Sequence, residues 1–191
     1  MSQRELRVLE GGWLSDTRRC PSPNQDARPA DCEPALIVVH GISLPPGQFG
    51  GDWIDDLFLN RLDPRIHPFF EEIRDLQVSA HLLIRRDGER LQYVAFSRRA
   101  WHAGRSSYRG QERCNDFSIG IELEGTDQIP YADPQYRELA RVIRVLRRHY
   151  PDIQPDAIVG HADIAPGRKT DPGPVFNWAE LRRLLDQPLD F

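Results

Sequence analysis

The segment FSIGIELEG, residues 117–125, alternates between apolar and non-apolar side chains without a break. This period of two is that of a β-strand, whose successive side chains point to opposite faces of a sheet. The apolar face comprises Phe117, Ile119, Ile121 and Leu123, and the opposite face comprises Ser118, Gly120, Glu122 and Glu124. The segment therefore predicts a strand with one apolar face and one face that is first small and then acidic.

Further strands and helices follow in mixed order along the chain. ALIVVH, residues 35–40, is a continuous apolar run that favours a buried strand. A hairpin is predicted in residues 78–96, with its turn at Asp87-Gly88, and a short strand in residues 157–161. The predicted helices lie within residues 52–62, 67–76, 133–150 and 176–187. The last helix has Asn177 as a candidate N-cap. The third helix has an apolar stripe, which comprises Tyr136, Leu139, Val142, Ile143 and Leu146.

Length and composition predict one globular domain over residues 1–191. The chain is 39% hydrophobic and 28% charged, which suffices for a real core. Residues 1–34 are polar and punctuated by proline, so we expect an extended segment packed on the domain surface. The expected fold class is mixed α/β, with a single central mixed β-sheet flanked by helices.

Charge and hydropathy exclude several classes of partner. The net charge of −4 gives no basic footprint for nucleic acid. No uninterrupted run of about 18 apolar residues predicts a membrane span, and charges interrupt the N-terminus too often for a signal peptide. We therefore expect a cytoplasmic protein. Three widely spaced cysteines, Cys20, Cys32 and Cys114, predict free thiols.

Two histidines, His40 and His161, each end a short apolar strand and precede a loop rich in glycine and proline. One such histidine is more often a packed residue, but a pair at strand ends favours a site. Asp171 follows in VGHADIAPGRKTDPGP, residues 159–174, where no helix or long strand can continue. Two histidines and one carboxylate suit a catalytic zinc, which keeps a position open for water. Spacing alone explains Asp171 equally well as a turn-forming residue.

A catalytic zinc site also needs a proton carrier, and Glu122 and Glu124 lie on the same strand face. Ser118 and Gly120 would leave room for a ligand above that face. The alternative is that both glutamates are solvated charges at a sheet edge, and periodicity cannot choose between the two.

The other histidines have simpler interpretations. His81 lies inside a predicted strand and is most simply a buried, hydrogen-bonded residue. His102 follows Trp101 in a loop, where an aromatic ring and an imidazole can line a sugar or peptide site.

Four blocks together carry a family resemblance, and they run in order from about Cys20 to Trp178. They are LIVVHGISLPPGQFGG, VSAHLLIRRDG, RAWHAGRSSYRGQERCNDFSIGIELEGT and GHADIAPGRKTDPGP. The chain resembles the AmpD-type 1,6-anhydro-N-acetylmuramyl-L-alanine amidases, within the type 2 N-acetylmuramoyl-L-alanine amidase and peptidoglycan-recognition superfamily. One departure is Gly41, where related enzymes often have a polar residue such as Asn.

The resemblance implies a role for each candidate residue. One Zn²⁺ per chain would be bound by His40, His161 and Asp171. Glu122 would be the catalytic carboxylate, Lys169 the electrophilic partner, and Trp101 and Arg113 would lie in the substrate site, beside His102. The substrate would be a small anhydro-muropeptide, cleaved between the lactyl group of 1,6-anhydro-N-acetylmuramic acid and L-alanine during cytosolic peptidoglycan recycling.

No obligate protein partner is expected. Two alternatives remain: a binding module that has lost the metal, and a lytic amidase that acts outside the cell.

Overall fold

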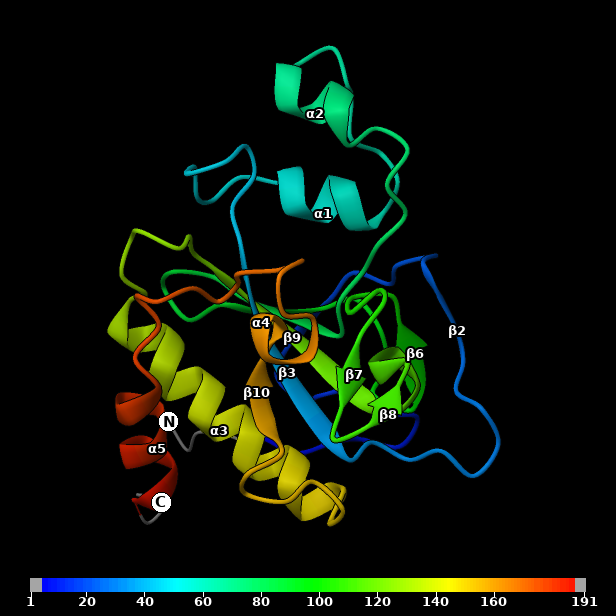
Figure 1. Ribbon diagram of the computed structural model, residues 1–191, viewed down its shortest axis with the longest axis vertical. Coiled ribbons are helices and arrows are strands. Elements are labelled where there is room, and N and C mark those ends of the chain that lie inside the picture. Colours follow the sequence, from blue (N-terminus) through cyan, green and yellow to red (C-terminus); the bar gives the residue numbers. More distant parts are fainter. Residues whose placement is uncertain (1–4, 188–191) are drawn as a thin grey trace.

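The structure, a computed structural model that describes residues 5–187, is built on a six-stranded mixed sheet. The strand order is β1-β5-β4-β9-β3-β10, with β4 and β5 antiparallel and the other neighbours parallel. The strands of this sheet are β1 (Arg18–Arg19), β3 (Leu36–Ile42), β4 (Leu82–Ile84), β5 (Arg90–Gln92), β9 (Ser118–Glu124) and β10 (Ile158–Gly160). The predicted fold class, a central mixed sheet flanked by helices, is confirmed (Figure 1).

The remaining elements surround this sheet. Two small antiparallel ribbons are formed by β2 (Gln25–Ala27) with β6 (Arg98–Ala100) and by β7 (Ser107–Tyr108) with β8 (Gln111–Glu112). The helices are α1 (Trp53–Phe58), α2 (Pro68–Glu72), η1 (Cys114–Asp116), α3 (Asp133–His149), α4 (His161–Ile164) and α5 (Trp178–Asp186). The hairpin at Asp87-Gly88 is confirmed, and so is Asn177 as the N-cap of α5, since its side chain accepts from the Glu180 N–H at 3.0 Å.

One face of the sheet packs against α3 and α5 (Figure 1). The predicted stripe of α3 is buried throughout, and it meets the alternate residues Ile119, Ile121 and Leu123 of β9 together with Ile37 and Val39 of β3. This burial supplies the apolar driving force for that half of the core. The residues that alternate with these along the two strands, His40 and Glu122 among them, therefore belong to the opposite face.

On that opposite face, α1 and α2 stand over one end of the sheet and α4 lies beside β10 (Figure 1). β9 is a central strand between β3 and β4, so the interpretation of its glutamates as solvated edge charges is wrong. His161 does not end a strand that runs into an irregular loop. It is the first residue of α4, a single helical turn that precedes the prolines.

The N-terminal segment is tied to the domain by backbone pairing and by Arg28. β1 pairs with β5, and the Arg28 guanidinium donates to the carbonyl oxygens of Phe96, Asn115, Asp116 and Ser118 at 2.8–3.2 Å. Burial lowers the pKa of Arg28 to about 10. The three cysteines are free thiols, as predicted, and no helix within residues 5–187 has the length and apolar character to cross a bilayer.

We expect Leu146→Ala to reduce the free energy of unfolding by about 2–5 kcal/mol, because the side chain is fully buried between α3 and the sheet. Arg148→Ala, on the exposed side of the same helix, should change it by less than about 0.5 kcal/mol. Urea unfolding of both variants measures the difference, and equal losses would contradict the assigned helix face.

Candidate active site

Three side chains from separate elements bring one donor atom each to a common point. His40 lies in β3, His161 begins α4, and Asp171 lies in the loop that follows. Nδ1 of His40 lies 3.0 Å from Nδ1 of His161 and 3.0 Å from Oδ2 of Asp171, and the remaining pair is 3.1 Å apart. Parallel pairing of β10 with β3 places the two histidines at the same edge of the sheet, where open sheets bind ligands.

Each histidine is held through its second ring nitrogen. Nε2 of His40 lies 2.9 Å from Nδ1 of His102, whose own Nε2 lies 3.1 Å from Ser118 Oγ. Nε2 of His161 lies 3.2 Å from the Ala103 carbonyl oxygen, which can only accept. The Ala103 carbonyl therefore assigns the proton of His161 to Nε2, and a proton on Nε2 of His40 is compatible with its contact to His102, so both Nδ1 lone pairs can face the common point.

These donors fit a zinc ion. Ligands at 2.0–2.1 Å from a tetrahedral zinc are separated by about 3.3 Å, close to the separations observed here. Burial lowers the pKa of His40, which favours the neutral ring that a metal requires. Burial would raise the pKa of Asp171, but its hydrogen bonds to His161 and His40 hold it well below its ordinary value. The site thus offers two imidazole nitrogens and one carboxylate oxygen.

The structure distinguishes the environments of Glu122 and Glu124, which the period of the strand could not do. Glu124 is 1% exposed and fully bonded: it accepts from the N–H groups of Gly50 and Arg86 and pairs with Arg85. Glu122, 9% exposed, lies opposite His40 in the β3–β9 register and lines the cavity, with Oε2 unbonded. Burial and repulsion by Asp171 raise the pKa of Glu122 well above its ordinary value. Glu122 is therefore suited to accept and release a proton.

Lys169 and Trp101 line the same cavity as the three donors. Lys169 is exposed, and it forms no ion pair within 4.0 Å among residues 5–187. An ammonium in this place is free to face a bound ligand.

His102 borders the cavity, but its ring also packs against the protein interior. Its ring fills the space above Gly120, where a Cβ atom would lie 2.4 Å from the imidazole. The expectation that Ser118 and Gly120 leave room for a ligand is therefore wrong, because His102 takes that room. Both nitrogens of His102 bond protein groups, so the predicted substrate contact is better replaced by a role in orienting His40. His81 is buried and hydrogen-bonded, as predicted.

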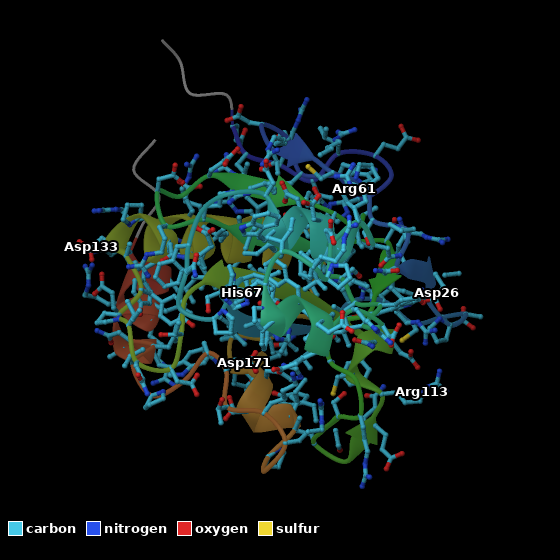
Figure 2. The ribbon with its side chains drawn as sticks, turned by 90° about the horizontal axis from the view of Figure 1, so that it is seen from above. Asp26, Arg61, His67, Arg113, Asp133 and Asp171 are labelled. Carbon is cyan, nitrogen blue, oxygen red and sulfur yellow. The ribbon has the colours of Figure 1, made fainter. Side chains whose placement is uncertain are left out.

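Arg113 does not join this cluster. It lies outside the cavity that holds the three donors, its side chain is 70% exposed, and it pairs with Asp116 at 3.1 Å. Figure 2 places Arg113 toward the rim of the molecule and Asp171 nearer its centre. A contact between Arg113 and a substrate stays a prediction that this geometry does not favour.

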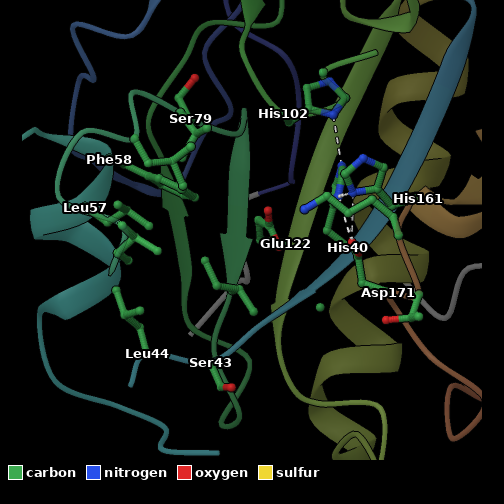
Figure 3. Close-up of a pocket in the computed structure, with 18 of the residues that line it drawn as sticks. His40, Ser43, Leu44, Leu57, Phe58, Ser79, His102, Glu122, His161 and Asp171 are labelled. Atoms are coloured by element: carbon green, nitrogen blue, oxygen red, sulfur yellow. Dashed lines mark hydrogen bonds and ion pairs between the residues drawn. The ribbon is translucent and has the colours of Figure 1, made fainter. Parts of the chain in front are cut away.

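The cavity beside the donors has a volume of about 670 Å³ and two unlike walls. Leu44, Leu57 and Phe58 form an apolar wall, across from the histidines in Figure 3. Sequence reasoning missed this wall because α1 and its preceding loop reach the site only through tertiary packing. The apolar period of residues 52–62 signalled a helix, but not which face would line a cavity.

We expect Glu124→Gln to cost about 1–3 kcal/mol of unfolding free energy, because it removes the charge that Arg85 pairs with inside the protein. Glu122→Gln should cost little or nothing in metal-free protein, since it removes a buried carboxylate with an unbonded oxygen. Thermal or urea unfolding of the two metal-free variants decides this. A larger loss for Glu122→Gln would overturn the distinction between the two glutamates.

Comparisons with known proteins find one family of enzymes. Residues 30–174 match the family described as N-acetylmuramoyl-L-alanine amidase. The 1,6-anhydro-N-acetylmuramyl-L-alanine amidase AmpD of Escherichia coli (strain K12) is 63% identical, over 94% of this chain and 98% of that protein. A crystal structure of a Se-Met AmpD derivative superposes with a TM-score of 0.90 at 61% identity, covering 93% of this chain and 99% of the other.

A more distant structure contains a ligand. It is a complex of the N-acetylmuramyl-L-alanine amidase AmiD from E. coli with the substrate anhydro-N-acetylmuramic acid-L-Ala-D-gamma-Glu-L-Lys. It aligns with a TM-score of 0.57 at 30% identity, over 95% of this chain and 66% of that one. Fold, matched residues and identity over nearly full length lead to one conclusion: the chain belongs to the N-acetylmuramoyl-L-alanine amidase family, as an AmpD-type member.

Proposed function

We propose that the chain hydrolyses the amide bond between the lactyl group of 1,6-anhydro-N-acetylmuramic acid and the L-alanine of a stem peptide, using zinc held by His40, His161 and Asp171. The observation that carries this proposal is the convergence of these three donor atoms beside the buried, unpaired carboxylate of Glu122. Relatives named for this activity, and a related amidase bound to an anhydromuramyl peptide, support the choice of substrate.

Zinc, when bound, supplies Lewis-acid polarisation of the scissile carbonyl and makes water more acidic. The two histidines, through Nδ1, and Asp171 would hold the ion, while His102 and the Ala103 carbonyl fix the rings that carry those nitrogens. Glu122 takes the proton from the attacking water and gives it to the leaving amine of L-alanine. Its raised pKa suits both steps, because a carboxylate of ordinary pKa is a poor acid near neutral pH.

Lys169 stabilises the negative charge that develops on the carbonyl oxygen. Of the 25 lysines and arginines in the sequence, it is the only lysine. The two are not interchangeable, since lysine presents a compact point charge on a flexible stem and arginine a wide planar fork. A compact ammonium can approach a single oxygen beside the metal without competing for Asp171.

The alternative of a metal-free binding module is less well supported. All three donors and Glu122 are present and share one cavity, so nothing required for cleavage is missing from the chain. The proposed place of action is the cytoplasm, in peptidoglycan recycling, where soluble anhydro-muropeptides are the substrate. The experiments that follow test the metal, the two catalytic side chains and the substrate in turn.

Protein purified without added metal should contain about one equivalent of zinc, and chelation should abolish release of peptide from an anhydromuramyl-peptide until zinc is restored. His40→Ala should lose both metal and activity, because it removes one of three ligands. Elemental analysis and a turnover assay measure the two quantities together. Full activity in zinc-free protein would overturn the proposed mechanism.

Glu122→Gln should retain zinc and lose about 10²–10⁴-fold in kcat, because the amide can neither accept nor deliver the proton. The comparison is between kcat and zinc content in the same preparation. Retained turnover in this variant would exclude Glu122 as the proton carrier.

Lys169→Ala should lower kcat by about 10²-fold with zinc occupancy unchanged, because the cation acts mainly on the charge of the transition state. Lys169→Arg keeps the charge but changes its shape, so we expect only partial recovery. Steady-state kinetics with elemental analysis tests this. Loss of zinc in Lys169→Ala would instead indicate a role in holding Asp171.

Soluble anhydromuramyl-peptides should be cleaved much faster than intact murein, if the chain acts in recycling. Release of peptide from the two substrates, at matched concentrations of the scissile bond, gives the ratio. Comparable rates would contradict the preference and would favour a lytic role.

A further inference from the structure

The ring of Tyr131 lies beside the metal site without lining the cavity. This residue belongs to the loop between β9 and α3, is 6% exposed, and packs on Phe176 with ring centroids 5.2 Å apart. Its hydroxyl donates to the carbonyl oxygen of Pro172 at 2.9 Å. Pro172 directly follows Asp171, so the hydroxyl is anchored one residue from a proposed metal ligand.

Two glycines make the space for this ring. A Cβ atom on Gly125 would lie 2.1 Å from Cε1 of Tyr131, and a Cβ atom on Gly41 would lie 2.2 Å from its hydroxyl oxygen. Real Cβ atoms do not approach other heavy atoms so closely, so no larger residue fits at either position while the ring stays in place. Gly41 directly follows His40, a second proposed ligand. The hydroxyl thus bridges the chain segments that carry His40 and Asp171.

The loop that carries Asp171 has few other ways to be fixed. Pro172 has no N–H group, so anchoring at this point depends on carbonyl oxygens. The Asp171 carbonyl accepts from the Ala162 N–H at 2.9 Å, and the Pro172 carbonyl accepts from Tyr131. One bond holds the carbonyl of Asp171 and the other the carbonyl of Pro172, so the chain is anchored at two successive residues.

We propose that Tyr131 is a positioning residue for the metal site, which holds Asp171 at its distance from His40 by clamping the Pro172 carbonyl over Gly41. This also gives a reason for the glycine at position 41: the Tyr131 hydroxyl occupies the space that a side chain there would need. The inference rests on the proposed zinc site. It concerns how firmly the chain holds the ion and not the chemistry of the reaction.

The first test is zinc affinity, measured by competition with a chromogenic chelator. Tyr131→Phe keeps the ring and removes the anchor, and it should weaken zinc binding about 10-fold or more, as loss of groups that orient metal ligands does. Tyr136→Phe is the matched control. Its hydroxyl is buried in the same aromatic cluster but accepts from the Asn177 N–H at 2.8 Å, away from the ligands.

Tyr136→Phe should therefore lower the melting temperature of the metal-free protein about as much as Tyr131→Phe and leave zinc affinity unchanged. Equal zinc affinities in wild-type protein and Tyr131→Phe, or an equal loss in both variants, would overturn the positioning role. Wild-type protein that binds no zinc would overturn the proposed function as well, so the two failures are distinguishable.

The second test needs no metal. Gly41→Ala should lower the melting temperature by roughly 5 °C because the new methyl group meets the hydroxyl. In the Tyr131→Phe background the nearest ring atom would be Cζ at 3.5 Å, an ordinary contact, so the same change should cost much less. Additive effects of the two changes would show that the hydroxyl does not occupy this space.

Discussion

The parallel pairing of β3 with β9 and β10 is the constraint on which the rest of the site depends. It places His40 opposite Glu122 in one register and brings the end of β10, which leads into His161, to the same edge. A shift of β9 by one residue would turn Glu122 to the helix-covered face and bring Leu123 to the cavity. The apolar residues of β9 oppose that shift, since they are buried against α3. The packing of α3 on one face therefore maintains the chemistry on the other.

The local sequence pattern was sufficient to predict the two strands and the long helix that frame the site. The apolar run at residues 35–40, the alternation at 117–125 and the stripe of α3 each follow from a period that burial requires, and each element formed as predicted. The three donor residues were found because each histidine closes a short apolar run in the sequence and a carboxylate follows in a stiff loop, although His40 lies within β3 and His161 begins α4. The strand order could not be predicted from the local pattern, because it depends on contacts between residues that are distant in the sequence. For the same reason, β9 could not be recognised as a central strand.

The features of the site that the sequence could not predict share a physical cause. Ser118 and Gly120 indicated open space, but small residues leave room for any neighbour, and here that neighbour is the ring of His102. The position of Arg113 likewise depends on the fold of the β7–β8 ribbon and η1, for which the sequence has no clear period. The choice between Glu122 and Glu124 needed Arg85 and the N–H groups that bind Glu124. Side-chain roles that depend on a partner far along the chain are therefore the last to be predictable.

The two glutamates also show how the site separates stability from reactivity. Glu124 is charged, buried and fully bonded, so its charge stabilises the contact between the loop before α1 and the sheet. Glu122 has the same side chain two residues earlier, but burial and repulsion by Asp171 raise its pKa, and the fold leaves one of its oxygens without a partner. A carboxylate with the hydrogen bonds of Glu124 would be a weaker base, because those bonds favour its charged form, and it could not exchange a proton near neutral pH. The unsatisfied oxygen is thus a cost to folding that the surrounding bonded groups offset, and the raised pKa is the property that suits Glu122 to the proton transfer we propose.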